Sequence, residues 1–251
     1  MRILLLNPNT TEALTERMAR VARGIAAPET IIEMATAPRG LPYIATRAEA
    51  VIASAIALEM LAERMGKHDA VIMAAFGDPA LAAARELLSV PVVGLAEAAM
   101  LTACTLGRRF SIVTFSENLA PWFEESAVAT GLAARLASLR VARQSFSEID
   151  RVQEEMAEAL VEAATLAAHE DGAEVIIFGG APLAGLAKRI GHLIPVPVID
   201  SVECATRMAE TLALLQPRKA AIGSFRRPAP KPSLGLPAAL AAWLDYDTTR
   251  P

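Results

Sequence analysis

The chain is poor in thiols, imidazole and aromatic rings. Its 251 residues include 2 cysteines and 3 histidines, which are scattered along the sequence. So few ligands, without paired spacing, form neither a disulfide framework nor a metal site, and we expect no bound metal. Aromatic residues make up 4% of the chain, although hydrophobic residues make up 53%. A core built mostly from alanine, leucine and valine favours helices packed on a sheet over a β-sandwich.

An excess of basic charge and long apolar runs are also missing. The net charge is −4 and the pI is about 5.5, whereas a nucleic-acid-binding protein typically presents a basic face. The one short basic run lies in a proline-rich stretch, residues 226–231. No run approaches the length of a membrane span, and the apolar run at the N-terminus is too short for a signal sequence. We expect a cytoplasmic protein that binds a small molecule, without nucleic-acid or membrane partners. Its alanine-rich helical faces would permit a homo-oligomer.

Short β-like runs alternate with longer helix-like runs along most of the chain. This alternation predicts an α/β fold with a mostly parallel sheet and helices on both faces. The predicted strands cover residues 3–6, 30–35, 70–74, 92–95, 110–114, 136–141, 174–178 and 197–200. The first of the longer predicted helices is capped by Thr10 or Thr11 and runs to about residue 25. The others cover residues 47–65, 96–106, 117–130, 147–170 and 202–215. Beyond Pro217 we expect a loose, proline-rich tail with a short helix at 236–244.

An internal repeat organises the chain. Residues 71–79 reappear in outline as 175–182, and residues 90–97, which begin Val-Pro-Val, match 196–203. Each copy runs from a buried strand through a small-residue turn and a helix to a Val-Pro-Val strand and an acidic helix start. Any two βαβ units share some likeness, but the common Val-Pro-Val and the equally placed glutamates favour duplication.

The duplication predicts two similar α/β lobes with parallel sheets, related by a pseudo-two-fold axis, with the active-site cleft between them. We assign residues 1–95 and 202–251 to the first lobe and residues 96–201 to the second. Ligands of open parallel sheets bind beyond the carboxyl ends of the strands. Both small-residue turns would therefore border the cleft.

Five segments, in the same order, resemble the aspartate/glutamate racemase superfamily, and most of all its hydantoin and allantoin racemases. The first segment opens the chain and contains Asn-Pro-Asn-Thr, and the likeness extends over roughly residues 1–215. The segments are residues 1–18, 76–85, 94–100, 109–114 and 195–200. The resemblance implies a two-lobed fold and catalysis without a cofactor, in which one cysteine removes the α-proton and a second returns one from the opposite face.

The two positions that this resemblance assigns to catalytic cysteines hold Ala75 and Gly180. Inverting a carbon centre requires a base on one face and an acid on the other, and neither residue can move a proton. Three explanations stay open. The chain is a natural relative that uses other acid and base groups on a hydantoin-like or amino-acid-derived substrate, as a racemase, isomerase, lyase or ring-opening enzyme. Alternatively it is a non-catalytic ligand-binding paralogue, or an engineered, cysteine-less and inactive variant, although Gly180 is an unusual choice for engineering.

Three acidic residues are the candidate replacements for the thiols. Asp78 lies in the first turn, where it is a candidate acid or the N-cap of the following helix, because Pro79 suits the first helical position. Glu97 and Glu203 are equivalent in the repeat and sit at helix starts, where they would complement the helix dipoles. If they faced one another across a desolvated cleft, one would have a raised pKa and would serve as an acid.

The candidate binding residues lie at the ends of strands. Asn7, Asn9 and Thr10 follow the first strand, and Thr114 holds the matching place in the other lobe. Backbone N–H groups in the second turn would bind an anionic oxygen, Tyr43 would lie over the ligand, and turn chemistry alone is the alternative explanation for each. The remaining candidates are Phe76, Gly77, Gly179, Gly180 and Ala181. Of the two cysteines, Cys104 fits a helix core, and Cys204 lies near the expected rim of the cleft.

Overall fold

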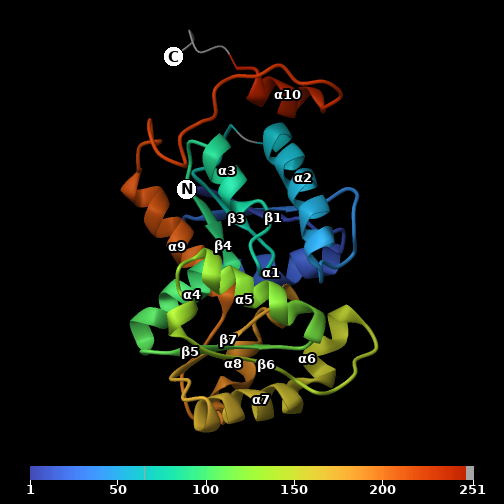
Figure 1. Ribbon diagram of the computed structural model, residues 1–251, viewed down its shortest axis with the longest axis vertical. Coiled ribbons are helices and arrows are strands. Elements are labelled where there is room, and N and C mark those ends of the chain that lie inside the picture. Colours follow the sequence, from blue (N-terminus) through green and yellow to red (C-terminus); the bar gives the residue numbers. More distant parts are fainter. Residues whose placement is uncertain (65, 247–251) are drawn as a thin grey trace.

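The computed structural model describes residues 1–64 and 66–246. Residue 65, the last of the helix predicted over 47–65, and residues 247–251, the end of the predicted first lobe, lie outside the described residues. Two parallel, four-stranded sheets dominate the molecule (Figure 1). The first sheet has the order β2-β1-β3-β4, with β1 at Arg2–Asn7, β2 at Ile31–Thr36, β3 at Ala70–Met73 and β4 at Val92–Gly94. The second has the order β6-β5-β7-β8, with β5 at Phe110–Thr114, β6 at Leu136–Val141, β7 at Val175–Phe178 and β8 at Val198–Ile199. The identical orders confirm the predicted fold of two similar α/β lobes.

Helices cover the sheets and match most of the predicted ranges. They are α1 (Glu12–Ile25), α2 (Arg47–Arg64), α3 (Leu81–Leu87), α4 (Leu95–Leu106), α5 (Ala120–Ala129), α6 (Val152–Glu155), α7 (Ala157–Glu170), α8 (Leu186–Ile190), α9 (Ser201–Leu215) and α10 (Ala238–Leu244). The single helix expected over 147–170 is wrong, because a 3-10 turn precedes α6 and Met156 leaves the helical conformation between α6 and α7. Helix α6 is tied to the second turn, since the buried side chain of Gln153 donates to the carbonyls of Pro182 and Ala184.

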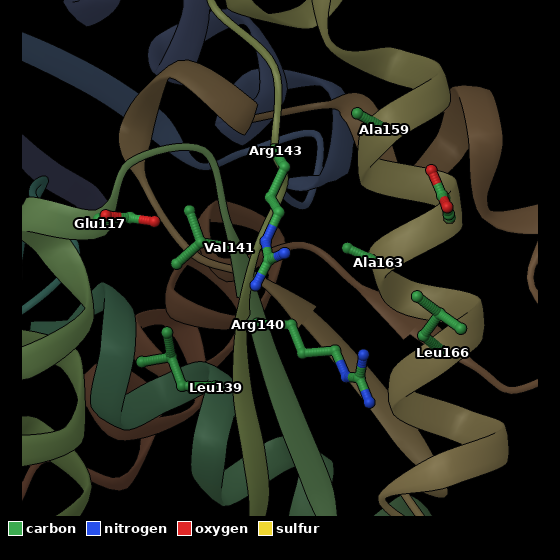
Figure 2. Close-up of a pocket in the computed structure, with 9 residues that line it drawn as sticks. Glu117, Leu139, Arg140, Val141, Arg143, Ala159, Ala163 and Leu166 are labelled. Carbon is green, nitrogen blue, oxygen red and sulfur yellow. The ribbon is translucent and has the colours of Figure 1, made fainter.

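The edge strand β6 of the second sheet faces α7 across a groove (Figure 2). The two central strands of this sheet, β5 and β7, are buried along their whole length and mostly apolar. Strands buried on both faces are expected where helices cover a parallel sheet on both sides.

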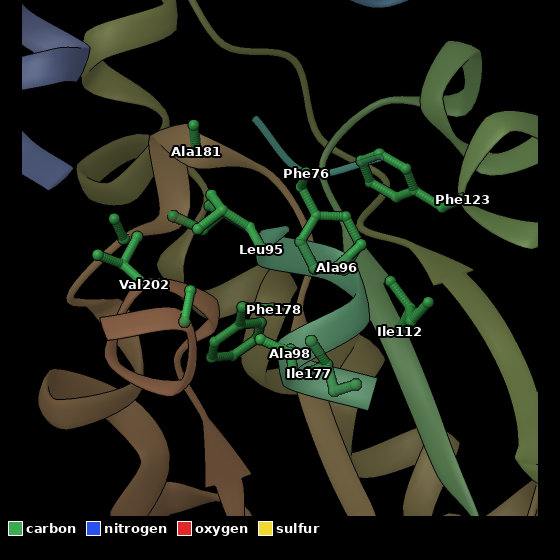
Figure 3. Close-up of a cluster of buried hydrophobic side chains, with 14 of the residues drawn as sticks. Phe76, Leu95, Ala96, Ala98, Ile112, Phe123, Ile177, Phe178, Ala181 and Val202 are labelled. Carbon is green, nitrogen blue, oxygen red and sulfur yellow. The ribbon is translucent and has the colours of Figure 1, made fainter. Parts of the chain in front are cut away.

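Helices α4 and α9 join the two lobes. Helix α4 packs against both β4 and β7, and α9 packs against α4, β3 and β4. Their apolar side chains belong to one continuous core that includes residues of both sheets (Figure 3). Because α4 contacts both sheets, the lobe boundaries at residues 95 and 202 stay predictions.

The C-terminal segment returns to the first lobe. Helix α10 packs on α2, and Trp243 lies against the smaller of the two hydrophobic clusters. The guanidinium of Arg227 sits 3.7 Å from the ring centroid of Tyr246, in cation–π contact. Among the residues described, no helix is both long and apolar enough to cross a membrane.

Candidate functional site between the lobes

The two small-residue turns border one cavity. Ala75, just after β3, and Gly180, just after β7, both line it, and its volume of about 20 Å³ is enough for one water molecule. The complete lining is Asn9, Tyr43, Ile44, Ala75, Phe76, Leu119, Trp122, Phe123, Gly180 and Ala181. The structure therefore brings together the two positions that the resemblance assigns to catalytic cysteines.

No thiol belongs to this lining, as far as the described residues go. Cys204 lines a different pocket, between α4 and α9, and burial raises its thiol pKa to about 11. Cys104 lies on α4 and packs against the main core. A thiol with a raised pKa is mostly protonated at neutral pH, and Cys204 lies outside the cavity between the turns.

Two polar side chains reach the cavity with hydrogen-bonding capacity to spare. The Asn9 amide oxygen accepts from Thr11 N and Asn7 Nδ2, each at 3.0 Å, while its Nδ2 donates to no group among the described residues. The Tyr43 hydroxyl is buried and has no partner in the described part of the chain. Desolvation raises the pKa of Tyr43 well above its ordinary value, so the phenol stays protonated.

Other predicted binding residues hold the cavity in shape. Asn7 is fully buried, and its Nδ2 also donates to Thr15 Oγ1 at 2.9 Å, so this side chain fastens the end of β1 to α1. Thr10 donates its backbone N–H to Leu41 O at 2.9 Å. The hydroxyl of Thr114 donates to Gly179 O at 2.9 Å and ties β5 to the second turn.

The predicted cap of the first helix is only half correct. Thr11 occupies the N-cap position of α1, but its side chain makes no capping bond. Its hydroxyl donates instead to Pro42 O at 2.6 Å, which anchors the loop that carries Tyr43. Asn9 accepts from the Thr11 N–H, which holds the turn ahead of the helix without replacing the side-chain cap.

The second turn depends on glycine. Gly180 has φ +126°, in a region that side chains rarely adopt. A β-carbon on Gly180 would lie 2.7 Å from Cε1 of Phe115, and one on Gly179 would lie 2.8 Å from a methyl of Ile112. The carbonyl of Pro182 accepts from Arg17, on α1 of the other lobe, at 2.8 Å. Position 180 therefore differs from a cysteine site in its space as well as in its chemistry.

The prediction that Asp78 caps the following helix is wrong. Asp78 has φ +53°, and α3 begins later, with Ala80 as its N-cap. The carboxylate reaches across to α4 and accepts from Ala96 N at 2.9 Å and Glu97 N at 2.8 Å. It fills the space beside Gly94, the residue at the N-cap position of α4. Burial raises the pKa of Asp78 to about 7, because desolvation outweighs the two amide bonds that favour the carboxylate.

In the second lobe an aspartate also binds the N-terminus of a helix, but it lies at the start of that helix and not in the turn. Asp200, which matches Gly94 in the repeat, is the N-cap of α9 and accepts from Val202 N at 2.8 Å and Glu203 N at 3.1 Å. Its other oxygen accepts from Gly185 N at 2.6 Å, in the second turn. Sequence reasoning missed this residue, although an acid between a Val-Pro-Val strand and a helix is a recognisable capping signal.

Glu97 and Glu203 do not line the cavity. The carboxylate of Glu97 forms a two-pronged ion pair with Arg85, and Glu203 pairs with Lys188 at 2.9 Å. Each lies beside its own pocket, and neither pocket is the cavity between the turns. Their positions at helix starts agree with the simpler role of complementing helix dipoles.

The apolar wall of the cavity escaped sequence reasoning. Leu119 precedes α5, Trp122 and Phe123 lie in its first turn, and Ile44 comes from the loop before α2. The rings of Phe123 and Phe76 meet edge to face with centroids 4.6 Å apart. Adjacent Trp and Phe in a chain with few aromatic residues were the available signal.

Two more predicted residues sit near the cavity without lining it. Gly77 lines the neighbouring pocket, where a β-carbon would lie 2.6 Å from the indole of Trp122. Gly179 lies behind Gly180 and accepts the Thr114 hydrogen bond. Both glycines therefore allow close packing around the cavity rather than direct contact with its contents.

The groove between β6 and α7 is larger than the cavity between the turns, but its arginines are ion-paired or exposed and it lies away from both turns. The guanidinium of Arg140 is bound to Asp171 at 2.6 Å and to Glu170 at 2.6 Å, and Arg143 is exposed (Figure 2). None of the small-residue turns borders it. Within residues 1–64 and 66–246, no cluster of histidine, cysteine or acidic side chains has the arrangement of a metal site.

Known proteins resemble this chain over most of its length. The sequence profile described as Asp/Glu/Hydantoin racemase matches residues 3–209. A hydantoin racemase of Paenarthrobacter aurescens is 36% identical over 233 residues, which cover 92% of this chain and 99% of that protein. A hydantoin racemase of Pseudomonas sp. (strain NS671) is 31% identical, with 94% and 95% covered.

Solved structures agree with the sequence relatives. The allantoin racemase of Pseudomonas fluorescens superposes with a TM-score of 0.88 at 36% identity, covering 94% of this chain and 100% of that one. The allantoin racemase of Klebsiella pneumoniae gives 0.89 at 34% identity, covering 96% and 98%. A glutamate racemase of Bacillus anthracis, at 17% identity and a TM-score of 0.62, shares the fold. The chain belongs to the Asp/Glu/hydantoin racemase family.

Proposed function

We propose that this chain binds a small cyclic amide of the hydantoin type between its lobes, in a cavity that must widen to admit it, without the two-thiol proton exchange that the family resemblance implies. The observation that carries the proposal is the composition of the cavity. Ala75 and Gly180 face the same space, and its described lining contains no thiol, carboxylate or imidazole. A racemase needs an acid and a base on opposite faces of its substrate, and neither face has one.

The polar groups of the cavity suit a neutral ligand with carbonyl oxygens. Tyr43 Oη is a buried hydrogen-bond donor without a protein partner in the described structure, and the Asn9 amide lines the same cavity. Leaving a buried donor unpaired costs about 1–3 kcal/mol, so a ligand that accepts from the Tyr43 hydroxyl recovers free energy. Among the described residues no lysine or arginine lines the cavity, and a carboxylate would be desolvated there without a counter-charge. Hydantoins meet these demands better than free amino acids do.

The substituent of the ring would lie against the apolar wall. Trp122, Phe123 and Leu119 offer an aromatic and aliphatic surface, and Phe76 joins it from the first lobe. Hydantoins with an aromatic or aliphatic substituent at C5 would bury apolar area there, at about 25 cal/mol per Å². The hydantoin racemase and allantoin racemase names of the relatives point to the same class of ring.

The test separates binding from chemistry. Enantiopure 5-benzylhydantoin is incubated with the protein in deuterated buffer, while NMR follows binding by saturation transfer and exchange at C5 by loss of the proton signal. Saturation transfer without enzyme-dependent exchange is the expected result. Absence of binding would refute the proposal, and rapid exchange with racemisation would refute the loss of two-sided proton transfer.

A one-sided reaction is the second candidate, favoured by the unpartnered hydroxyl of Tyr43. A phenol that stays protonated can donate to the oxygen of a developing enolate, while another group or water removes the proton. This reaction would give C5 exchange that is lost in Tyr43→Phe. Neither Asp78→Asn nor Glu97→Gln should abolish it, because neither carboxylate lines the cavity.

A further inference from the structure

The cavity between the turns is closed around a space for one water molecule, about 20 Å³. Pockets for small ligands typically measure about 300–1,000 Å³, so a hydantoin needs one wall of the cavity to move. Protein interiors are close-packed, and a wall can retreat only where empty space lies behind it. The wall that meets this condition marks the way in.

Trp122, in the first turn of α5, is a wall with space behind it. Its side chain lines the cavity and also a larger pocket of about 440 Å³. This outer pocket is also lined by Gly77, Glu125, Ser126 and Phe225. It reaches the surface, because the side chain of Glu125 is 54% exposed. Trp122, which is 9% exposed, therefore separates a closed cavity from an open pocket.

The indole rests on the first turn where that turn has no side chain. A β-carbon on Gly77 would lie 2.6 Å from two carbons of the indole, so glycine makes room for the ring. Phe123 contacts the indole in a tilted arrangement, with centroids 5.9 Å apart, but is itself 1% exposed and held edge to face by Phe76. The indole can therefore leave its place while Phe123 stays, and its departure uncovers the turn that carries Ala75.

The loop that carries Tyr43 is the other wall to consider, and it is fastened to the first lobe. Pro42 O accepts from Thr11 Oγ1 at 2.6 Å. Leu41 O accepts from Thr10 N at 2.9 Å. Moving this loop breaks both hydrogen bonds, whereas the indole has the outer pocket to move into.

An exposed ion pair ties α5 to the first lobe. The guanidinium of Arg47, the first residue of α2, donates through Nε to both carboxylate oxygens of Glu125, at 3.0 and 2.9 Å. Glu125 lies one turn after Trp122 on α5, so the pair restrains the part of the helix that carries the indole. Both side chains of the pair are exposed, and exposed pairs stabilise only weakly. The pair thus steadies the closed state without locking it.

We propose that Trp122 is the gate of the cavity and sets the size of the ligand that the cavity admits. When the indole moves into the outer pocket, the cavity and the outer pocket become one chamber that opens to the surface beside Glu125. A hydantoin ring enters through this chamber, and the indole then bounds the space left for its C5 substituent. The gate is a property of the ligand-free protein, whereas its role in size selection rests on the proposed function.

The gate is tested by the rate at which a thiol in the cavity wall is alkylated in the ligand-free protein. Ala75→Cys supplies the thiol, iodoacetamide is the reagent, and mass spectrometry of the peptide with residue 75 gives the rate. Adding Trp122→Phe or Trp122→Ala should raise the rate, roughly tenfold or more for alanine, because less of the partition is left. Leu119→Ala is the matched variant, since Leu119 lines the cavity but not the outer pocket, and it should leave the rate within about twofold.

The ion pair provides a second and milder perturbation. Glu125→Gln should raise the rate of alkylation at residue 75 by up to about fivefold, because an exposed pair holds α5 only weakly. Glu124→Gln is its control and should leave the rate unchanged, since Glu124 is exposed on the same helix but is not the partner of Arg47.

Cys104 and Cys204 lie outside the cavity, so their alkylation reports general loosening of the protein. If Trp122→Ala accelerates it, the rate at residue 75 in Trp122→Phe decides instead. An unchanged rate at residue 75 in the Trp122 variants, or an equal rise in Leu119→Ala, overturns the gate.

Size selection is measured by calorimetric titration with two ligands, 5-benzylhydantoin and 5-(naphthylmethyl)hydantoin. Trp122→Ala should shift the affinity ratio toward the larger substituent by roughly tenfold, because the space that the indole filled becomes available for apolar burial. An unshifted ratio refutes size selection by Trp122. If neither ligand binds the unchanged protein or the variant, the proposed function is refuted, while the alkylation rates still decide the gate.

Discussion

The ring of Phe115 stands 2.7 Å from the place where a β-carbon on Gly180 would lie. Phe115 also packs against Tyr43 of the first lobe, with ring centroids 6.0 Å apart, and edge to face against Phe146 at 5.6 Å. The ring is fixed from two sides and cannot easily move away. Glycine at position 180 is therefore built into the contact between the lobes.

Gly180→Ala should destabilise the protein by about 2–4 kcal/mol, because overpacking at Phe115 adds to the cost of a positive φ. Gly131→Ala is the matched control, since Gly131 also has a positive φ, +73°, but nothing within 4 Å of its β-carbon. Urea unfolding of both variants measures the difference. Equal losses would show that Phe115 yields without cost, contrary to this expectation.

Ala75→Cys should add a base to the first face of the cavity. The small buried site accepts the extra sulfur near Phe76 and the turn amides, and one thiol is enough to exchange the C5 proton of a bound hydantoin without inverting it. We expect deuterium incorporation with little racemisation, measured by NMR and polarimetry. Ala74→Cys is the control, because Ala74 is buried but does not line the cavity. Exchange by both variants alike would point to a non-specific thiol effect.

Tyr43→Phe should separate stability from binding. Removing a buried hydroxyl that has no partner leaves the free energy of unfolding unchanged or raises it by up to about 1 kcal/mol, whereas affinity for a hydantoin should fall about 5–10-fold. Tyr246→Phe, whose hydroxyl donates to Pro228 O at 2.9 Å, should instead lose stability and keep affinity. Thermal unfolding and calorimetric titration measure the two effects. Unchanged affinity in Tyr43→Phe would remove this residue from the binding site.

Asp78 should make the free energy of unfolding depend on pH. Its pKa in the folded state is raised, so its contribution is fully present below the unfolded value of 3.8 and is lost as pH rises through about 7. Within that window the contribution changes by about 1.4 kcal/mol per pH unit. The difference between the unchanged protein and Asp78→Asn, measured by urea unfolding at several pH values, isolates this slope. A difference that is constant with pH would mean that Asp78 ionises as it does in water.

Gly94→Ala should be costly for a steric reason alone, because φ at Gly94 is −91° and suits alanine. The new methyl would meet the Asp78 carboxyl group, and we expect a loss of about 1–3 kcal/mol. The loss should shrink in an Asp78→Gly background, where both the side chain and the positive-φ strain are gone. A double-mutant cycle by urea unfolding measures this coupling, and strictly additive losses would contradict it.

Much of the fold and part of the site were accessible from sequence. The alternation of apolar runs and helical runs predicted both parallel sheets, and the Val-Pro-Val repeat predicted two similar lobes. Since parallel strands present their carboxyl ends at one edge, Ala75 and Gly180 were expected at a common cleft, and both line one cavity. Tyr43 and Asn9 were expected there as well, and they lie in its lining.

The misplaced residues share a physical cause. Asp78 precedes α3 in sequence, but its carboxyl group accepts hydrogen bonds from α4. Glu97, on α4, pairs with Arg85 on the preceding helix, α3. Which groups become partners depends on how the helices pack and where their ends meet, and no local sequence pattern specifies this. Trp122 reaches the cavity for the same reason, because α5 of the second lobe leans over the first turn.

The sequence by itself determined the two sheets, the duplication and the lack of sulfur at residues 75 and 180, because strand and helix periods and residue identities are local properties. Only the tertiary structure decided that Asp78 fastens a strained turn to α4 and that Phe115 reserves position 180 for glycine. Both facts depend on contacts between segments far apart in the chain, where burial sets the cost of a charge and close packing sets the room for an atom.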